Sequence, residues 1–393
     1  MNDLRLPTQR SGFEPPDLAP VIVTERTPTG WRGLTSDGEI YNVTAHVNGE
    51  PATIPESLSI QRGGDVIGYR KVEQAISAGV IDQYAAHLAA SNAAVRSDSA
   101  RAYEEINAAM AVAPTMLARY NRAMILLAMG DWAAGFEEFA YCERESDLFK
   151  RPQWRAAMDA GLEPWMGQDL RNKKILLIHD HGFGDTIMAL RFVPALARMG
   201  ANTTLMVPQE LERLASQIAA PTTRDLVDCD YVCSILMLMN VLQIEPHEIP
   251  TAPYLRVDPT LVKSWRDRLP EGTRRIGIAW SVGKMVDGDY PRACPLEKFE
   301  QHINGTLFAV QKTDKGFVFE DFYDCAGLMM ALDEIVTVDT AAVHLAGAIG
   351  HPNVSLMLSH WHSWRWQAPL YDNVTIYPQD APGDWDSAFS KRK

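Results

Sequence analysis

Apolar and polar positions follow two different spacings in the chain after residue 150. Short apolar runs alternate with stretches in which apolar residues recur every three or four positions. The first pattern predicts buried strands and the second predicts amphipathic helices. The predicted strands are residues 174–178, 203–207, 275–280, 306–311, 334–338 and 353–358. The predicted helices are residues 185–199, 210–218, 259–269, 296–302, 325–332 and 340–349.

This alternation is typical of parallel sheets with helices on their faces, so it predicts an α/β fold. A proline-rich break at residues 245–258 divides the predicted strands into two sets. Two such halves that face each other leave a cleft, and clefts between domains are common ligand sites.

The chain before residue 151 shows two other patterns. Residues 1–70 are rich in Pro, Gly and Thr and contain short β-like runs, which predicts a small β-rich or extended segment. Residues 71–150 are rich in Ala, and Ala102, Ile106 and Ala109 have helical spacing. The predicted domains are therefore residues 1–70, 71–150, 151–270 and 271–393.

Small and aromatic residues in the helical region resemble a short array of tetratricopeptide repeats. They include Gly130, Trp132, Gly135 and Phe139. Arrays of this kind form binding surfaces, so a protein partner is one expectation. The alternative is a plain helical domain that packs on the rest of the chain, because fewer than three repeats rarely stand alone.

Composition excludes a disordered or fibrous protein. The chain has 393 residues, of which 46% are hydrophobic and 22% are charged, as in globular proteins with more than one domain. The formal net charge of −13 gives no general attraction for nucleic acid or anionic lipid. Any bound phosphate must therefore be held by local donors.

Cysteine usage and the first residues bear on the compartment. The five cysteines include no CxxC pair, and an odd number argues against a disulfide framework. The N-terminal residues lack the apolar core of a signal peptide, and the apolar run at residues 233–242 is too short to cross a bilayer. We expect a cytoplasmic protein without a membrane span.

A glycine turn follows the first strand of the α/β part. Gly182 and Gly184 lie in the loop after residues 174–178, and Asp185 comes at the predicted start of a helix. A strand, a glycine turn and a helix start form a common α/β site for a phosphorylated ligand. Asp185 can act there as a general base, or it can simply cap the helix.

A second junction of strand and helix lies at residues 338–344. Asp339 and Thr340 end a β-branched strand, and a helix of small residues follows. The Thr340 hydroxyl, backbone N–H groups and the helix dipole can hold phosphate oxygens, with His344 one turn along on the same face. The alternative is that Asp339 caps the helix and His344 is an ordinary buried histidine.

Polar residues near two other strand ends extend the candidate site. Lys284 and Arg292 follow the strand at residues 275–280 and can pair with a phosphate. Gln311 and Lys312 end the next strand, where open α/β sheets bind ligands. Each of these side chains can also be an ordinary surface residue.

Several ordered segments resemble the bacterial heptosyltransferase-like glycosyltransferases of family 9, in particular the members with tetratricopeptide repeats. These segments are GFGDTIMALRFVPALARMGANTTLMVP, APYLRVDP, RIGIAWS, PRACPLEKF, the pair Gln311 and Lys312, ALDEIVTVDTAAVHLAGAIGHPNVSLML, WRW at residues 364–366 and GDW at residues 383–385. The resemblance implies two Rossmann-like domains of the GT-B type. It also implies a nucleoside-diphosphate sugar as co-substrate in the cleft, with no metal and no other cofactor.

The resemblance further implies roles for individual residues. It makes Asp185 the catalytic base and gives Asp339, Thr340 and His344 contacts to the diphosphate and the sugar. Inverting sugar transfer needs a base for the acceptor hydroxyl and a cationic or dipolar cradle for the leaving diphosphate. The acceptor, whether saccharide, glycolipid or protein, is not identified. The predicted nucleotide-sugar site comprises Gly182, Gly184, Lys284, Arg292, Gln311, Asp339, Thr340 and His344.

Other functions remain open at this point. An inert body with helical repeats would be an interaction protein, and nucleotide-sugar epimerases can share the two-domain architecture. A nicotinamide site is disfavoured because Ile187 stands where the third glycine of that motif belongs. We attribute the DxD-like triplets at residues 228–230, 287–289 and 384–386 to turns rather than to a metal site.

Overall fold

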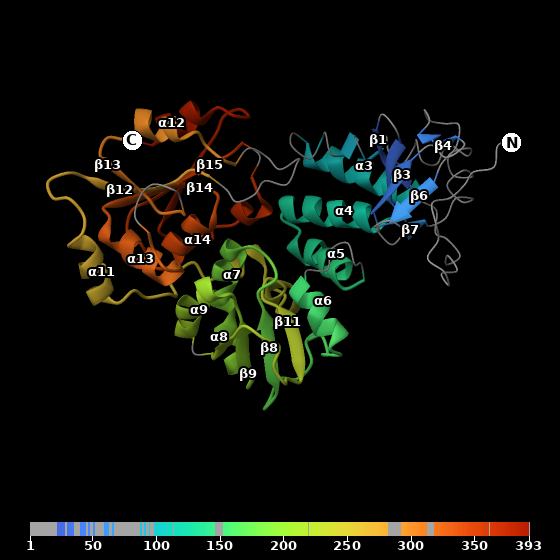
Figure 1. The fold of residues 1–393 in the computed structure, drawn as a ribbon, viewed down its shortest axis with the longest axis horizontal. Coiled ribbons are helices and arrows are strands. Elements are labelled where there is room, and N and C mark those ends of the chain that lie inside the picture. Colours follow the sequence, from blue (N-terminus) through green and yellow to red (C-terminus); the bar gives the residue numbers. More distant parts are fainter. Residues whose placement is uncertain are drawn as a thin grey trace. The chain divides into compact units, whose positions relative to one another are not determined.

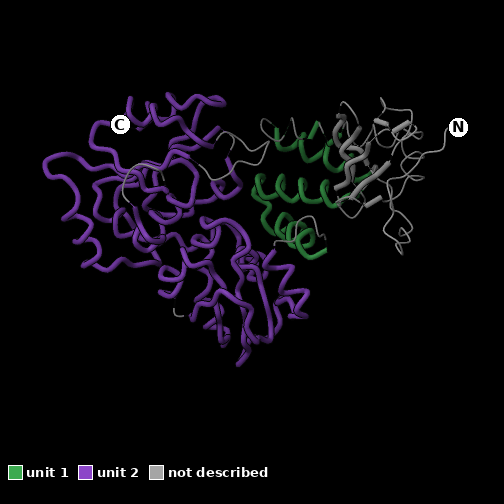
Figure 2. Tube along the Cα trace, viewed as in Figure 1, with its two compact units in different colours: residues 1–150 green, residues 151–393 purple. Residues whose placement is uncertain are grey.

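The computed structural model describes the side chains of residues 98–111, 114–145, 152–218, 220–281, 292–312, 318–360 and 362–392. It also describes a few positions from 87 to 94 and backbone strands between residues 22 and 66. The chain divides into two compact units, residues 1–150 and residues 151–393 (Figure 2).

The first unit combines antiparallel strands with helices. One sheet has the order β1-β2-β3-β6-β7, and β4 pairs with β5. The strands are β1 (Ile22–Thr27), β2 (Gly30–Leu34), β3 (Ile40–Thr44), β4 (His46–Val47), β5 (Glu50–Pro51), β6 (Ser59–Arg62) and β7 (Asp65–Val66). The helices include α3 (Ser99–Val112), α4 (Met116–Ala128) and α5 (Trp132–Glu145). The tetratricopeptide interpretation and the partner surface stay predictions.

Polar contacts join the helices of the first unit. Thr115 caps α4 by accepting a hydrogen bond from the Ala118 N–H at 3.1 Å. Arg122 on α4 donates from Nε to Glu138 Oε2 on α5 at 2.9 Å and from Nη1 to Asn107 Oδ1 on α3 at 2.9 Å. Arg122 therefore connects all three helices.

The second unit contains two α/β lobes (Figure 1). The first lobe has a parallel sheet in the order β10-β9-β8-β11. Its strands are β8 (Lys174–Ile178), β9 (Asn202–Met206), β10 (Thr222–Thr223) and β11 (Tyr231–Ser234). Its helices include α6 (Pro152–Asp159), α7 (Phe183–Ala189), α8 (Val193–Arg198), α9 (Gln209–Ala215) and α10 (Leu238–Val241). The sequence predicted β8 and β9 but neither β10 nor β11.

The continuous helix predicted at residues 185–199 is wrong. The α7 helix ends at Ala189, a 3₁₀ turn covers Leu190–Phe192, and α8 begins at Val193. Pro194 has no N–H to donate to the carbonyl of Leu190, so one α-helix cannot run through this point.

The second lobe has a five-stranded parallel sheet in the order β13-β12-β14-β15-β16. Its strands are β12 (Arg275–Ala279), β13 (Thr306–Ala309), β14 (Glu334–Val338), β15 (Val354–Leu358) and β16 (Val374–Pro378). The helices around it include α11 (Pro259–Arg266), α12 (Leu296–His302), α13 (Phe322–Ala331), α14 (Ala341–Ala348) and α15 (Trp385–Lys391). The parallel sheets of the two lobes confirm the predicted α/β fold.

Helices cover both faces of the second sheet (Figure 1). The α12 and α15 helices pack on one face through Phe299, Trp385 and Phe389, which are buried against β12, β14 and β15. The α13 and α14 helices lie on the other face. In such a sheet ligands bind at the carboxyl ends of the strands, where the strand order reverses. That point lies between β12 and β14 here, and between β8 and β11 in the first lobe.

Arg191 is buried between the two lobes and joins them. Its Nη1 donates to the carbonyl oxygens of Pro250 at 2.8 Å and Leu370 at 2.6 Å. Its guanidinium lies over the rings of Tyr254 and Tyr371, 4.9 Å and 4.5 Å from their centroids. The cation therefore packs between aromatic faces where the lobes meet.

Two of the three DxD-like triplets have structural partners. Asp228 and Asp230 accept hydrogen bonds from neighbouring lysines, and Asp384 caps α15 by accepting from the Ser387 N–H at 3.1 Å. The triplet at residues 287–289 lies outside the described residues.

Two further findings concern the cysteines and the lengths of the helices. All five cysteines are free thiols. Within the described part of the chain, none of the helices has both the length and the apolar character that a bilayer span requires.

Candidate functional site

A pocket of about 610 Å³ lies between the two lobes of the second unit, at the carboxyl ends of β12 and β14. Its lining from the first lobe is Gly182, Phe183, Gly184, Asp185 and Glu210. Its lining from the second lobe is Ser281, Arg292, Val310, Gln311, Lys312, Phe319, Asp321, Phe322, Cys325, Met329, Asp339, Thr340, Ala341, Ala342, His344, Leu345, Ser363 and Arg365. Every predicted site residue that the structure describes lines this pocket. Lys284 lies outside the described residues.

Asp185 is held from both lobes. Its Oδ2 accepts a hydrogen bond from the Gly182 N–H at 3.2 Å, which closes the first turn of α7. Its Oδ1 accepts from Arg365 Nε at 2.8 Å and lies 2.5 Å from Arg365 Nη2. Burial raises the pKa of Asp185, but the charge and hydrogen bond of Arg365, together with the neighbouring His181 and His344, outweigh burial, and the pKa lies below its ordinary value. Asp185 thus caps the helix and also faces the pocket.

Gly184 allows α7 to approach α14, and Figure 1 shows the two helices side by side. A Cβ atom at this position would lie 2.8 Å from His344 Cδ2 and 3.3 Å from Ala341 Cα. At Gly182, by contrast, a Cβ atom would meet only the end of the Asp185 side chain, at 3.2 Å. Gly184 is therefore required by the close packing of the two lobes.

The start of α14 forms the opposite wall of the pocket. The Thr340 hydroxyl accepts from the Ala342 N–H at 3.2 Å, so Thr340 rather than Asp339 is the N-cap. Asp339 is buried, and its Oδ2 lies 3.6 Å from Arg292 Nη1. Among the described residues that oxygen has no hydrogen-bond partner, which leaves it able to accept from a ligand hydroxyl.

His344 is buried behind this wall. Its Nδ1 lies 3.0 Å from the Tyr371 hydroxyl oxygen. Its ring stacks on Trp366, with centroids 5.5 Å apart and planes at 18°. Burial lowers the pKa of His344 to about 4. The imidazole is therefore neutral near pH 7, and one of its two ring nitrogens carries a proton that it can donate.

Gln311 lines the pocket, but its amide group is hydrogen-bonded to Trp280 and Ser281. Its Oε1 accepts from the N–H groups of Trp280 at 2.8 Å and Ser281 at 3.1 Å. Its Nε2 donates to Ser281 Oγ at 2.7 Å. Gln311 thus fixes the chain after β12, and its predicted contact to a nucleotide stays a prediction. The neighbouring Lys312 adds a positive charge to the same wall.

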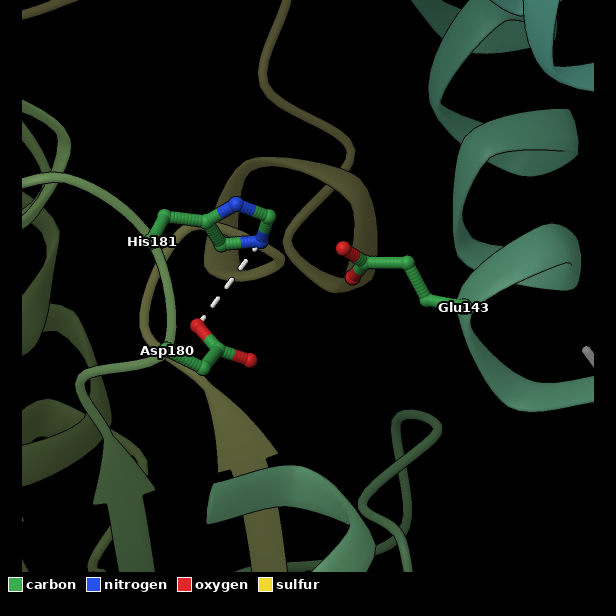
Figure 3. A group of neighbouring side chains, drawn as sticks. All are labelled: Glu143, Asp180 and His181. Carbon is green, nitrogen blue, oxygen red and sulfur yellow. Dashed lines mark ion pairs between the residues drawn. The ribbon is translucent and has the colours of Figure 1, made fainter. Parts of the chain in front are cut away.

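The loop after β8 is fixed by its own polar residues. His181 Nε2 lies 3.7 Å from Asp180 Oδ1 (Figure 3), and Ser234 at the end of β11 donates to the same oxygen at 2.8 Å. His179 Nδ1 lies 2.7 Å from Thr186 Oγ1. The two histidines therefore contact different partners and hold the loop that precedes Asp185.

Two features of the pocket were not assigned from the sequence. One is Arg365, which the WRW motif contained and which pairs with Asp185. The other is an apolar side made by Phe183, Phe319 and Phe322, in which the rings of Phe183 and Phe322 lie 5.0 Å apart. The sequence spacing of these three phenylalanines does not predict that they meet, because they come from loops and helix starts of different lobes.

No protein-family model matches this chain. Among curated proteins, Protein FlbA of Caulobacter vibrioides is 24% identical to it over 331 residues. That match covers 70% of this chain and 54% of the relative, so the chain spans about half the length of that protein.

Two solved structures are similar to part of the chain. The Escherichia coli ADP-heptose LPS heptosyltransferase II is 13% identical with a TM-score of 0.38, over 52% of this chain and 89% of that one. The glycosyl transferase family 9 structure from Veillonella parvula is 12% identical with a TM-score of 0.39, over 58% of this chain and 92% of that one.

Proposed function

We propose that this chain is an inverting, metal-independent glycosyltransferase that uses a nucleoside-diphosphate sugar. One observation carries the proposal: a single pocket has the Asp185 carboxylate on one wall and a helix start with basic side chains on the other. Sugar transfer needs both groups within reach of one anomeric carbon. The family resemblance of the sequence motifs implies the same base, Asp185, and gives diphosphate contacts to Asp339, Thr340 and His344.

The second lobe supplies the cradle for the leaving diphosphate. The first N–H groups of α14 and the positive end of its dipole favour an anion beside Thr340. Arg292 and Lys312 line the same pocket and supply charge-assisted donors. Together they stabilise the negative charge that develops on the diphosphate as it departs.

Asp185 supplies the base. Its carboxylate takes the proton of the acceptor hydroxyl, whose oxygen then bonds to the anomeric carbon of the donor. The bond between that carbon and the diphosphate oxygen breaks, and its electron pair leaves with the nucleoside diphosphate. Attack from the face opposite the leaving group inverts the anomeric centre.

A thermal-shift panel tests the donor half of this proposal. ADP, GDP, UDP and CDP and their hexose conjugates are each added to the full chain without metal and with EDTA. A cognate nucleotide at about 100 times its dissociation constant should stabilise the folded state by about 3 kcal/mol. If none of these nucleotides raises the melting temperature, the proposal is wrong.

Product analysis then separates the three functions that the sequence left open. Transfer of the sugar to an added saccharide, glycolipid or protein fraction supports the transferase. Conversion of the donor sugar without an acceptor would instead indicate an epimerase. Donor binding without either reaction would indicate an interaction protein, whose partner we expect to bind the helices of the first unit.

Our proposal for the compartment is the cytoplasm.

A further inference from the structure

Arg365 occupies the one carboxylate that the proposed reaction needs. It comes from a 3₁₀ turn of the second lobe (Trp364–Gln367), whereas Asp185 comes from α7 of the first lobe. Two guanidinium nitrogens meet Asp185 Oδ1, at 2.8 Å for Nε and 2.5 Å for Nη2. Its Nη1 donates to Ser363 Oγ at 2.9 Å. About a fifth of each side chain is exposed, 20% for Arg365 and 19% for Asp185, so the pair is partly shielded from water.

This pairing conflicts with base catalysis. A carboxylate that accepts two charged N–H donors is stabilised in its ionised form and takes a proton poorly. Oδ2 is also engaged, by the Gly182 N–H. Asp185 can become an effective base only when Arg365 leaves Oδ1.

The pocket itself offers Arg365 another anion. Arg365 lines the same pocket as Arg292, Lys312 and Thr340, the groups that would hold a diphosphate. A diphosphate carries more negative charge than one carboxylate, and its oxygens match the planar fork of a guanidinium. The side chain also has three or more rotatable bonds, so the guanidinium can move while the backbone stays in place.

We propose that Arg365 exchanges Asp185 for the diphosphate of the donor, so that donor binding itself releases the base. The inference rests on the proposed function and adds an order to it: the donor binds first, and Asp185 is then free to deprotonate the acceptor. Before the donor binds, the paired carboxylate cannot activate water or an acceptor. Arg365 is thus a positioning residue for Asp185 and a contact residue for the diphosphate.

Binding measurements on a double-mutant cycle test the exchange. The probes are the nucleoside diphosphate that gives the largest thermal shift and inorganic pyrophosphate. Asp185→Asn removes the competitor for Arg365, so nucleotide affinity should rise by about tenfold, the value of one charge-assisted hydrogen bond. Arg365→Met should weaken affinity by about tenfold for the same reason. In the Arg365→Met background, Asp185→Asn should change affinity by less than about twofold.

Asp321→Asn is the matched control. Asp321 lines the same pocket and carries the same charge, but it pairs with Arg213, which does not line the pocket. Asp185→Asn could also act only by removing repulsion between the carboxylate and the diphosphate. In that case Asp321→Asn would tighten nucleotide binding as well. Asp185→Asn would also still tighten it in the Arg365→Met background. Either result would overturn the exchange. Thermal melts of each variant show that the fold is retained, and Arg365→Gln replaces Arg365→Met if the latter is unstable.

The proposal can fail separately from the proposed function. If no nucleoside diphosphate binds the wild-type chain, the proposed function fails and the exchange fails with it. If a nucleotide binds and supports transfer but Asp185→Asn does not tighten its binding, only the exchange is wrong.

Discussion

The two lobes of the second unit build the same local structure and close it with caps of different charge. In each, a strand ends in a turn and a helix begins at the pocket, with α7 after β8 and α14 after β14. The first turn of α7 is closed by the carboxylate of Asp185. The first turn of α14 is closed by the neutral hydroxyl of Thr340.

This difference in the cap decides what each helix start can bind. The Asp185 carboxylate accepts from the Gly182 N–H and places a negative charge at the positive end of α7, so a phosphate there would be repelled. The Thr340 hydroxyl adds no charge at the start of α14, and the charge of the neighbouring buried Asp339 is balanced in part by Arg292, whose Nη1 lies 3.6 Å from Asp339 Oδ2. A strand-to-helix junction therefore indicates an anion site only after the charge of its cap is known.

The largest effect is expected from neutralising the charged cap. Asp185→Asn keeps the shape of the side chain and its acceptor oxygen for the Gly182 N–H, but it removes the base. Turnover should fall by about 10²–10⁴-fold, measured as nucleoside diphosphate released at saturating donor and acceptor. An unchanged turnover would show that Asp185 is a cap and nothing more.

A smaller effect is expected where the two helix starts touch. In Gly184→Ala the new methyl group would overlap His344 Cδ2 and make a tight contact with Ala341 Cα. The free energy of unfolding should fall by about 1–3 kcal/mol. Gly182→Ala is the matched control, because its Cβ atom meets only the movable end of Asp185. Urea denaturation of both variants should separate them, and equal stabilities would mean that α7 and α14 pack less closely than described.

Acid should lower the free energy of unfolding, because it protonates His344 of α14 in the unfolded chain. Its pKa is about 4 in the folded chain and 6.5 without burial, so between these values the unfolded chain binds more protons. The stability that the buried neutral His344 contributes is then present above pH 6.5 and is lost as the pH drops toward 4. The loss between pH 7 and pH 5 should be about 2 kcal/mol. The charged groups that act on His344 are Asp339, Asp185, Arg365 and Arg191.

Comparison with His344→Asn measures this contribution. Chemical denaturation of both proteins at pH 7 and pH 5 should show a smaller loss in the variant, because asparagine does not titrate. Identical losses would mean that the His344 imidazole is not responsible for the acid sensitivity.

The smallest effect is expected from removing the neutral cap. Thr340→Ala loses the hydroxyl that accepts from Ala342 N and should cost about 1 kcal/mol of stability. Thr340→Ser keeps the hydroxyl and should stay near the wild type. If serine and alanine behave alike in urea denaturation, the hydroxyl does not cap α14.

The fold was largely predictable from the sequence where strands are fully buried. The strands β8 and β14 have the predicted bounds, because runs such as Ile175–Ile178 must be covered on both faces. The strand β16 was missed because most of its residues are partly exposed and give no apolar run. The strand β11 is short and runs into the apolar residues of the next helix, so it has no boundary of its own.

Site residues were predictable from the sequence only where they directly follow a predicted strand. Asp185 and Thr340 follow strand ends, so their place in the pocket could be deduced. The pairing of Asp185 with Arg365 joins residues that are 180 positions apart. No local spacing encodes it, because it depends on how the second lobe packs against the first.

Arg191 has a consequence for how the lobes respond to acid. Its described hydrogen-bond acceptors include the carbonyl oxygens of Met188, Pro250 and Leu370, which do not titrate. The pair of Arg365 with Asp185, by contrast, loses its attraction once the carboxylate is protonated. At a pH low enough to protonate Asp185, the two lobes therefore lose the Arg365 ion pair but keep the hydrogen bonds of Arg191.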